Sequence, residues 1–139
     1  MSESGQGSLT ELARSIQTRN QQFQQELTEA AARVVSEPTT ALARFEHARD
    51  QADRLEQDEL ELLAQMGDWG LQQIQQTNNS WKQNRLQILL GKTQVLIVLG
   101  RYDDAQSVID SARLLITDSA DPAAMMLDEL EVTIIQAKA

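Results

Sequence analysis

The chain has 139 residues, a formal net charge of −9 and no cysteine. This length suits a single domain, and the lack of cysteine excludes a disulfide framework, a thiolate metal site and a cysteine nucleophile. His47 is the only histidine, so a multi-histidine metal site is excluded as well. The acidic balance argues against nucleic acid as a partner, because phosphate binding needs a basic surface.

The composition is typical of an all-α protein. Gln, Ala, Leu and Glu are abundant and favour helices, whereas only two prolines and six glycines interrupt the chain. The first residues lack the basic and apolar segments of a signal peptide, and no apolar run is long enough to span a bilayer. We therefore expect a cytoplasmic protein without a membrane partner, whose residues 1–7 form a disordered tail.

Two long helices are predicted in the first half of the chain. Ser8 and Glu11 fit a capping box that starts a helix over about 8–35. Pro38 disfavours helical geometry at the residue before it, so a turn is expected there. A second helix should follow from about Thr39.

The second helix carries a heptad seam. Apolar residues recur at heptad spacing in two sets, namely Phe45, Ala52 and Met66, and Ala48, Leu55, Leu62 and Trp69. Glu59 is the one polar residue in the first set. Sustained heptads are typical of coiled coils, so residues 8–79 are expected to form a long antiparallel, coiled-coil-like helical hairpin. The pattern leaves open whether its helices pair within one chain or between two.

Two stretches are expected to interrupt the helical pattern in the middle of the chain. Residues 66–70 contain two glycines and predict a kink or a helix end, although the apolar spacing could carry the second helix on to Gln76. Residues 77–79 predict a turn. Ser80 and Gln83 fit a second capping box. A third helix is therefore expected over about 81–99, and its apolar composition predicts a central, buried position.

The C-terminal part should hold two more helices. Gly100 ends the third helix, and a fourth is expected over about 103–117. Asp121 is a good N-cap and Pro122 a good first residue for a fifth helix. The inner face of that helix is expected to carry Met126, Leu130 and Ile134. Residues 80–139 should thus form a three-helix bundle packed as one unit with the hairpin.

Residues 86–118, about a quarter of the chain, resemble a tetratricopeptide repeat. In that family a Gly-x-Tyr-x-x-Ala turn joins two antiparallel helices. The matching residues are Gly100, Tyr102, Ala105, Ile109 and Ala112. The first helix departs from the pattern at Lys92 and Thr93, and Thr117 replaces the closing proline. The resemblance implies a helical hairpin that either supports a bundle or contributes to a peptide-binding groove.

No residue pattern points to catalysis. The tripeptide Gly91–Thr93 resembles the end of a phosphate-binding loop, but the glycine needed five residues earlier is Leu86. His47 has no sequence partner that would position it for acid–base chemistry. The acidic side chains over 50–68 are expected to form a solvated face rather than a cation site. We therefore expect no enzyme activity, no cofactor, no metal and no small-molecule substrate.

Charge is distributed unevenly along the chain. Residues 50–68 hold seven acids and one arginine, a net charge of −6, whereas residues 69–102 hold four basic residues and no acid, a net charge of +4. Opposite potentials favour packing of these two segments against each other, within one chain or between two. The alternative is an acidic face offered to a basic partner.

The sequence therefore predicts a non-enzymatic protein–protein interaction module, an adapter or a secretion-chaperone-like protein that binds an amphipathic helix or a basic segment of a protein partner. The alternative is a homodimeric scaffold whose heptad seam closes between two chains. Trp69 and Trp81 are candidate interface anchors or clamps of the hairpin end. The candidate contact residues are Phe45, Leu55, Leu62, Met66, Trp69, Trp81 and Tyr102. In the scaffold alternative, Leu55→Asp combined with Leu62→Asp should give a monomer.

Overall fold

Five α-helices make up residues 2–139, the part of the chain that the computed structural model describes, and no strand occurs among these residues. Side chains are described from Leu9 onward, and Met1 lies outside the described residues. The helices are α1 (Ser2–Ala32), α2 (Pro38–Ala64), α3 (Gly67–Val98), α4 (Tyr102–Arg113) and α5 (Pro122–Lys138). The all-α prediction is therefore confirmed.

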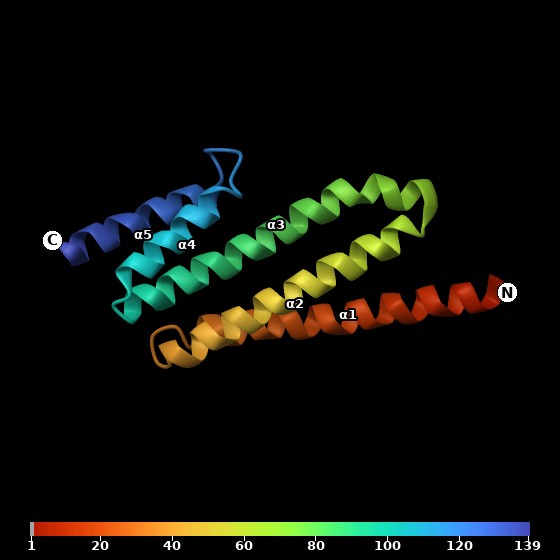
Figure 1. Cartoon of the computed structure of the whole chain (residues 1–139), viewed down its shortest axis with the longest axis horizontal. Helices are drawn as coiled ribbons and strands as arrows, with labels where there is room; N and C mark the ends of the chain where they lie inside the picture. Colours follow the sequence, from red (N-terminus) through yellow and green to blue (C-terminus); the bar gives the residue numbers. More distant parts are fainter. Residues whose placement is uncertain (1) are drawn as a thin grey trace.

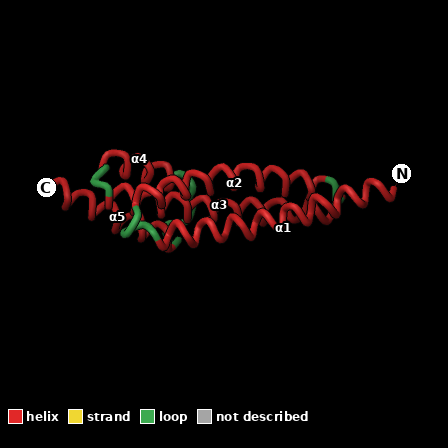
Figure 2. The backbone as a smooth tube through the Cα atoms, turned by 90° about the horizontal axis from the view of Figure 1, so that it is seen from below, coloured by secondary structure: helices red, strands yellow, loops and turns green. Residues whose placement is uncertain are grey.

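The three long helices lie next to one another in an up-down-up arrangement. α2 runs antiparallel to both α1 and α3 and packs against both, whereas the backbones of α1 and α3 approach each other at only a few points (Figure 1). α4 and α5 fold back onto the C-terminal half of α3 (Figure 1). The molecule is elongated, and its two termini lie at opposite ends (Figure 2).

Helix α1 starts earlier than the sequence predicts. It begins at Ser2, so the backbone of residues 2–7 continues the helix instead of forming a disordered tail, and Ser8 does not start it. Extending an existing helix by a residue has a small free-energy cost, because each added residue forms one further backbone hydrogen bond. The side chains of residues 1–8 lie outside the described part of the chain. The break at Pro38 is confirmed, since this proline is the first residue of α2.

The turn between α2 and α3 lies within the first predicted interruption. α2 ends at Ala64 and α3 begins at Gly67. Gly67 has a φ of 69°, the left-handed conformation that glycine adopts at little cost. Gly70 fits directly against the carbonyl of Leu63, where a Cβ atom would lie only 1.9 Å from the oxygen. The two glycines thus close the hairpin and let its helices approach.

The second predicted interruption is wrong. α3 is continuous through residues 77–79, and the predicted cap at Ser80 lies in the middle of the helix. Asn78 and Asn79 are exposed, so the only free-energy cost of keeping them helical is their weak helix propensity. The predicted boundary between the hairpin and the C-terminal bundle therefore falls inside α3.

The C-terminal helices begin where predicted, within a residue. Gly100 follows α3 with a φ of 75°, and the side chain of Asp121 accepts a hydrogen bond of 2.9 Å from the Ala123 amide at the start of α5. α4 ends at Arg113, four residues before the predicted end at residue 117. The inner face of α5 also differs, because Leu127 is buried while Met126 is partly exposed.

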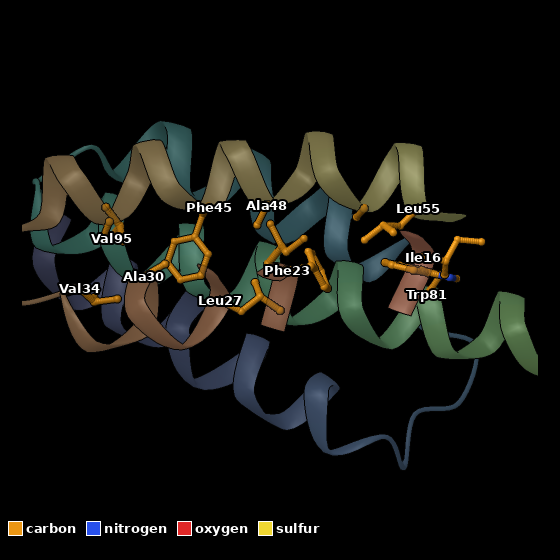
Figure 3. Close-up of a cluster of buried hydrophobic side chains, with 13 residues drawn as sticks. Ile16, Phe23, Leu27, Ala30, Val34, Phe45, Ala48, Leu55, Trp81 and Val95 are labelled. Carbon is orange, nitrogen blue, oxygen red and sulfur yellow. The ribbon is translucent and has the colours of Figure 1, made fainter. Parts of the chain in front are cut away.

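One core fills the space between α1, α2 and α3. Its large side chains are Phe23 of α1, Phe45 of α2 and Trp81 of α3, and the rings of Phe23 and Trp81 lie 5.5 Å apart (Figure 3). α2 contributes small residues, so its neighbours can approach closely; these are Ala41, Ala48 and Ala52. Gly91 of α3 makes room for the Phe45 ring, which a Cβ atom would meet at 2.2 Å.

A second core joins α4 and α5 to the C-terminal half of α3. Its buried members include Leu86 and Leu96 of α3, Ile109 of α4, and Leu127 of α5. Leu42 of α2 packs against both cores, so the two parts form one packed unit. None of the helices within residues 2–139 combines the length and apolarity needed to cross a membrane.

Candidate functional site

The heptad seam of α2 faces the inside of the molecule over most of its length. Phe45 and Leu55 are buried in the first core, and Leu62 is partly buried against it. Only the end of the seam is open, where Met66 and Trp69 are exposed at the α2–α3 turn. The seam that the scaffold alternative requires is thus covered within one chain.

The remaining predicted contact residues also divide between core and surface. Trp81 is buried, and Tyr102 is partly buried against the second core. In this conformation Phe45, Leu55 and Trp81 stabilise the bundle and are not accessible to a partner. Of the seven candidates, Met66 and Trp69 are the ones with an open surface.

Glu59 interrupts the apolar seam, and its carboxylate is the hydrogen-bond acceptor for the indole of Trp81. The indole Nε1 of Trp81 donates a hydrogen bond of 3.0 Å to Oε2 of Glu59. A buried indole N–H without a partner would be costly, and the carboxylate supplies that partner from the facing helix. The polar residue in the seam is therefore a structural feature of the α2–α3 interface.

The opposite charges of residues 50–68 and 69–102 meet inside one chain. Arg85 of α3 contacts Asp53 at 2.6 Å and Glu56 at 3.3 Å, both on α2. Burial disfavours the charged guanidinium, but the hydrogen bond to Asp53 and the nearby charge of Glu56 outweigh this and raise the pKa of Arg85. The predicted pairing of the two segments is confirmed in its intramolecular form.

Ion pairs also follow the α1–α2 interface. Arg19 of α1 contacts Asp58 at 2.7 Å, and Arg44 of α2 contacts Glu29 at 2.7 Å and Glu26 at 3.4 Å. His47 lies on the same interface, with Nδ1 3.3 Å from Oε1 of Glu26. His47 therefore has a positioning partner that the sequence did not reveal, and its own side chain is 62% exposed.

α4 and α5 are joined by a polar cluster around Arg113. Its guanidinium contacts Glu131 at 2.7 Å and Asp128 at 2.9 Å, and Gln106 also donates to Glu131. The hydrogen bond to Glu131 raises the pKa of Arg113. Hydrogen bonds from Arg113 and then Gln106 lower the pKa of Glu131. This cluster fixes the orientation of α5 on the bundle.

The tripeptide Gly91–Thr93 has a structural role. Gly91–Thr93 lies inside α3, and Thr93 is buried with its hydroxyl donating to the Leu89 carbonyl at 2.8 Å. Among the described residues, no group of three or more His, Asp or Glu side chains is arranged to hold a metal ion.

An open groove lies between α1, α3 and α5. Its walls are formed by Ala31, Val34 and Val35 of α1, Gln94, Ile97 and Val98 of α3, and Leu130 and Thr133 of α5. The described parts of α1 and α5 do not approach each other closely, so α3 forms the floor. The groove has a volume of about 430 Å³.

The groove is apolar and uncharged. Six of its eight lining residues are apolar and none is charged. Val35 is 80% exposed and Val98 46% exposed, so the groove offers aliphatic surface that no described residue covers. Sequence reasoning missed this site, because its walls come from three helices that are far apart in the sequence.

The helix α5 carries further exposed apolar side chains besides those that line the groove. Met125, Met126, Val132 and Ile135 are all more than 40% exposed. A helix that is apolar on most faces is usually buried in an assembly. This composition was the one signal in the sequence that could have pointed to a binding surface here.

Comparisons of the chain with protein-family models, with curated proteins and with solved structures find no significant match. Function therefore has to be inferred from the groove and from the distribution of charge around it.

Proposed function

We propose that this protein is a non-enzymatic protein–protein interaction module, of the adapter or secretion-chaperone type, that binds an amphipathic helix of a protein partner in the groove between α1, α3 and α5. The observation that carries the proposal is the uncharged aliphatic lining of the groove, with Val35 and Val98 exposed on its walls. Grooves of this kind bind helices through residues spaced three or four apart. The cytoplasm is the proposed place of action, in keeping with a chain that has no cysteine.

The resemblance to a tetratricopeptide repeat supports the same proposal. α3 and α4 are joined at Gly100, and Ala105 is fully buried where the second helix approaches the first. In this interpretation α3 and α4 form the repeat-like hairpin, and α5 forms the wall of the groove opposite α1. The C-terminal half of the molecule is then a scaffold that holds the groove open.

A display library of helical peptides, selected on the immobilised protein, tests this function. We expect enrichment of amphipathic helices whose binding is lost in Val98→Arg, because this change places a charge on the groove wall. Leu114→Arg is the matched control, since Leu114 is 85% exposed and lies outside the groove. Absence of enrichment, or peptides that bind Val98→Arg as well as wild type, would contradict the proposal.

A further inference from the structure

The groove lies at one end of an uncharged stripe on α3. The stripe consists of residues four or seven positions apart, which share one face of the helix. In order from the groove they are Val98, Gln94, Gln87, Ser80, Gln76 and Trp69. All six residues are exposed, and none carries a charge. The stripe thus has an apolar groove at one end and a large exposed aromatic side chain at the other.

α1 borders this stripe with an equally neutral surface. Gln17, Asn20, Gln21, Gln24 and Gln25 line a shallow depression along α1. The next depression adds Thr28 and Glu29, and the carboxylate of Glu29 pairs with Arg44 of α2. The interhelical ion pairs of α1 lie on its other side, toward α2. The face made by α1 and α3 is therefore uncharged over much of its length, in a chain with a net charge of −9.

Trp69 and Val98 have a simple geometric relation. They are 29 positions apart in α3, which is about eight turns and about 44 Å along one face of the helix. A two-fold axis perpendicular to α3 near Gln83 would relate two copies of the chain so that the Trp69 end of one α3 lies beside the Val98 end of the other. It places Trp69 of each copy at the groove of the other copy.

We propose that a second copy of this chain docks antiparallel on the α1–α3 face, with Trp69 as the anchor that enters the partner's groove. The N-terminal half of α3 then supplies the helix that lies in the groove. This inference rests on the proposed function, in that the same groove is taken to be a helix-binding site. In the dimer the groove is filled, so a partner helix has to displace the second copy.

Charge favours a second copy on this face and not on others. Two chains of net charge −9 repel each other, and the repulsion is strongest where acidic helices face one another. Six of the seven acids in residues 50–68 belong to α2, where Asp58 pairs with an arginine of α1 and Asp53 and Glu56 pair with one of α3, whereas Asp68 lies in the first turn of α3. On the α1–α3 face, Gln and Ser of one copy meet Gln and Ser of the other without like-charge contacts.

The anchor and the groove also match in chemistry. Trp69 is 56% exposed in the single chain, and tryptophan is among the residues most often found as an interface anchor in an apolar pocket. Met66 is also exposed, at the α2–α3 turn next to Trp69. Because a two-fold interface uses the same surface on both copies, each dimer contains two such contacts.

Native mass by light scattering, with a mixing experiment, tests the inference. Wild type and Leu114→Arg should have twice the chain mass of 15.5 kDa, whereas Trp69→Ala and Val98→Arg should each be monomeric. A mixture of these two variants should associate again, because Trp69 of one still meets an intact groove on the other. Far-UV circular dichroism checks that both variants fold, and Trp69→Gln replaces Trp69→Ala if it does not.

A monomeric wild type, an undiminished dimer in Trp69→Ala, or a mixture no more associated than its components would overturn the inference. Its failure is separate from that of the proposed function. Trp69→Ala keeps the groove intact and should still bind the selected helical peptides, whereas Val98→Arg should lose them whether or not the chain dimerises.

Discussion

The two sides of α1 differ in packing and in charge. The side toward α2 stabilises the fold, and the side toward the open face of α3 borders the proposed binding surface. Toward α2, α1 meets its neighbour through a close-packed core and a row of ion pairs, including Arg19–Asp58 and Arg44–Glu29. Toward the open side of α3, α1 presents glutamines and, at its end, Val35 above an apolar groove. The interhelical ion pairs of α1 lie on the side that is already packed against α2, and the uncharged side is the one left open.

The difference between the two sides of α1 bears on the association that we propose for this acidic chain. Paired carboxylates on α2 lose much of their repulsive effect, because arginines from α1 and α3 neutralise them. The neutral face carries no such charges, so bringing another helix to it costs little electrostatic free energy. Substitutions in the core and ion pairs between the helices should therefore change the free energy of unfolding. Substitutions on the neutral α1–α3 face should instead change association.

The largest effect is expected from Leu55→Asp. Leu55 is 1% exposed in the first core, so a carboxylate there would be buried without a partner and should reduce the free energy of unfolding by more than about 4 kcal/mol. Leu114→Asp, at an exposed leucine, should change it by less than about 0.5 kcal/mol. Urea denaturation followed by circular dichroism measures both. A folded monomeric Leu55→Asp variant would instead support the intermolecular seam.

Gly91→Ala tests the close contact between α2 and α3. The new Cβ atom would overlap the Phe45 ring, and we expect a net loss of about 2 kcal/mol from overpacking despite a gain in helix propensity of about 1 kcal/mol. In a Phe45→Leu background the same change should cost less, because the ring is gone. A double-mutant cycle of unfolding free energies checks this, and equal costs in both backgrounds would exclude the contact as the cause.

Glu59→Ala tests the polar partner of Trp81. Removing the carboxylate leaves the indole N–H without its acceptor, and we expect a loss of about 1–3 kcal/mol. Glu59→Gln keeps an acceptor and should lose less. Glu61→Ala, on the exposed side of α2, is the control and should lie within about 0.5 kcal/mol of wild type. Equal stabilities for Glu59→Ala and Glu61→Ala would show that the hydrogen bond contributes nothing.

The smallest effect concerns acid pH and the attachment of α5. Since Arg113 and Gln106 lower the pKa of Glu131 in the folded chain, the stabilisation is present above the unfolded pKa of Glu131 and is lost as pH falls through the lowered folded pKa. In Arg113→Gln, the loss of stability with acid should be shallower, by less than about 1 kcal/mol. Arg101→Gln serves as the control. Parallel pH curves of the urea midpoint for wild type and Arg113→Gln would contradict this.

The sequence predicts the local features of this fold well. The interruption at residues 66–70, predicted as a kink or a helix end, the cap at Asp121 and the turn at Gly100 all depend on residues within one turn of each other. The pairing of the acidic and basic segments is also predictable, because the net charge of each segment can be counted from the sequence. In the structure, Arg85 pairs with Asp53 and Glu56.

Features that depend on distant residues are not predictable in the same way. Residues 77–79 are typical of a turn by composition, yet packing of α3 along α2 keeps them helical. Heptad spacing shows that Leu55 and Leu62 share a face but not what covers it. The groove joins α1, α3 and α5, so no single segment of the sequence carries its pattern.

Disulfide cross-linking from single cysteines tests the central claim, that the uncharged α1–α3 face is the association surface, most directly. The natural chain has no cysteine, so each introduced thiol reports one position only. Gln83→Cys, near the proposed two-fold axis, should form a disulfide-linked dimer under mild oxidation, because the two Cα atoms then fall within about 7 Å. Gln57→Cys, exposed on α2, should stay unlinked. Cross-linking at residue 57 but not at residue 83 would contradict the account.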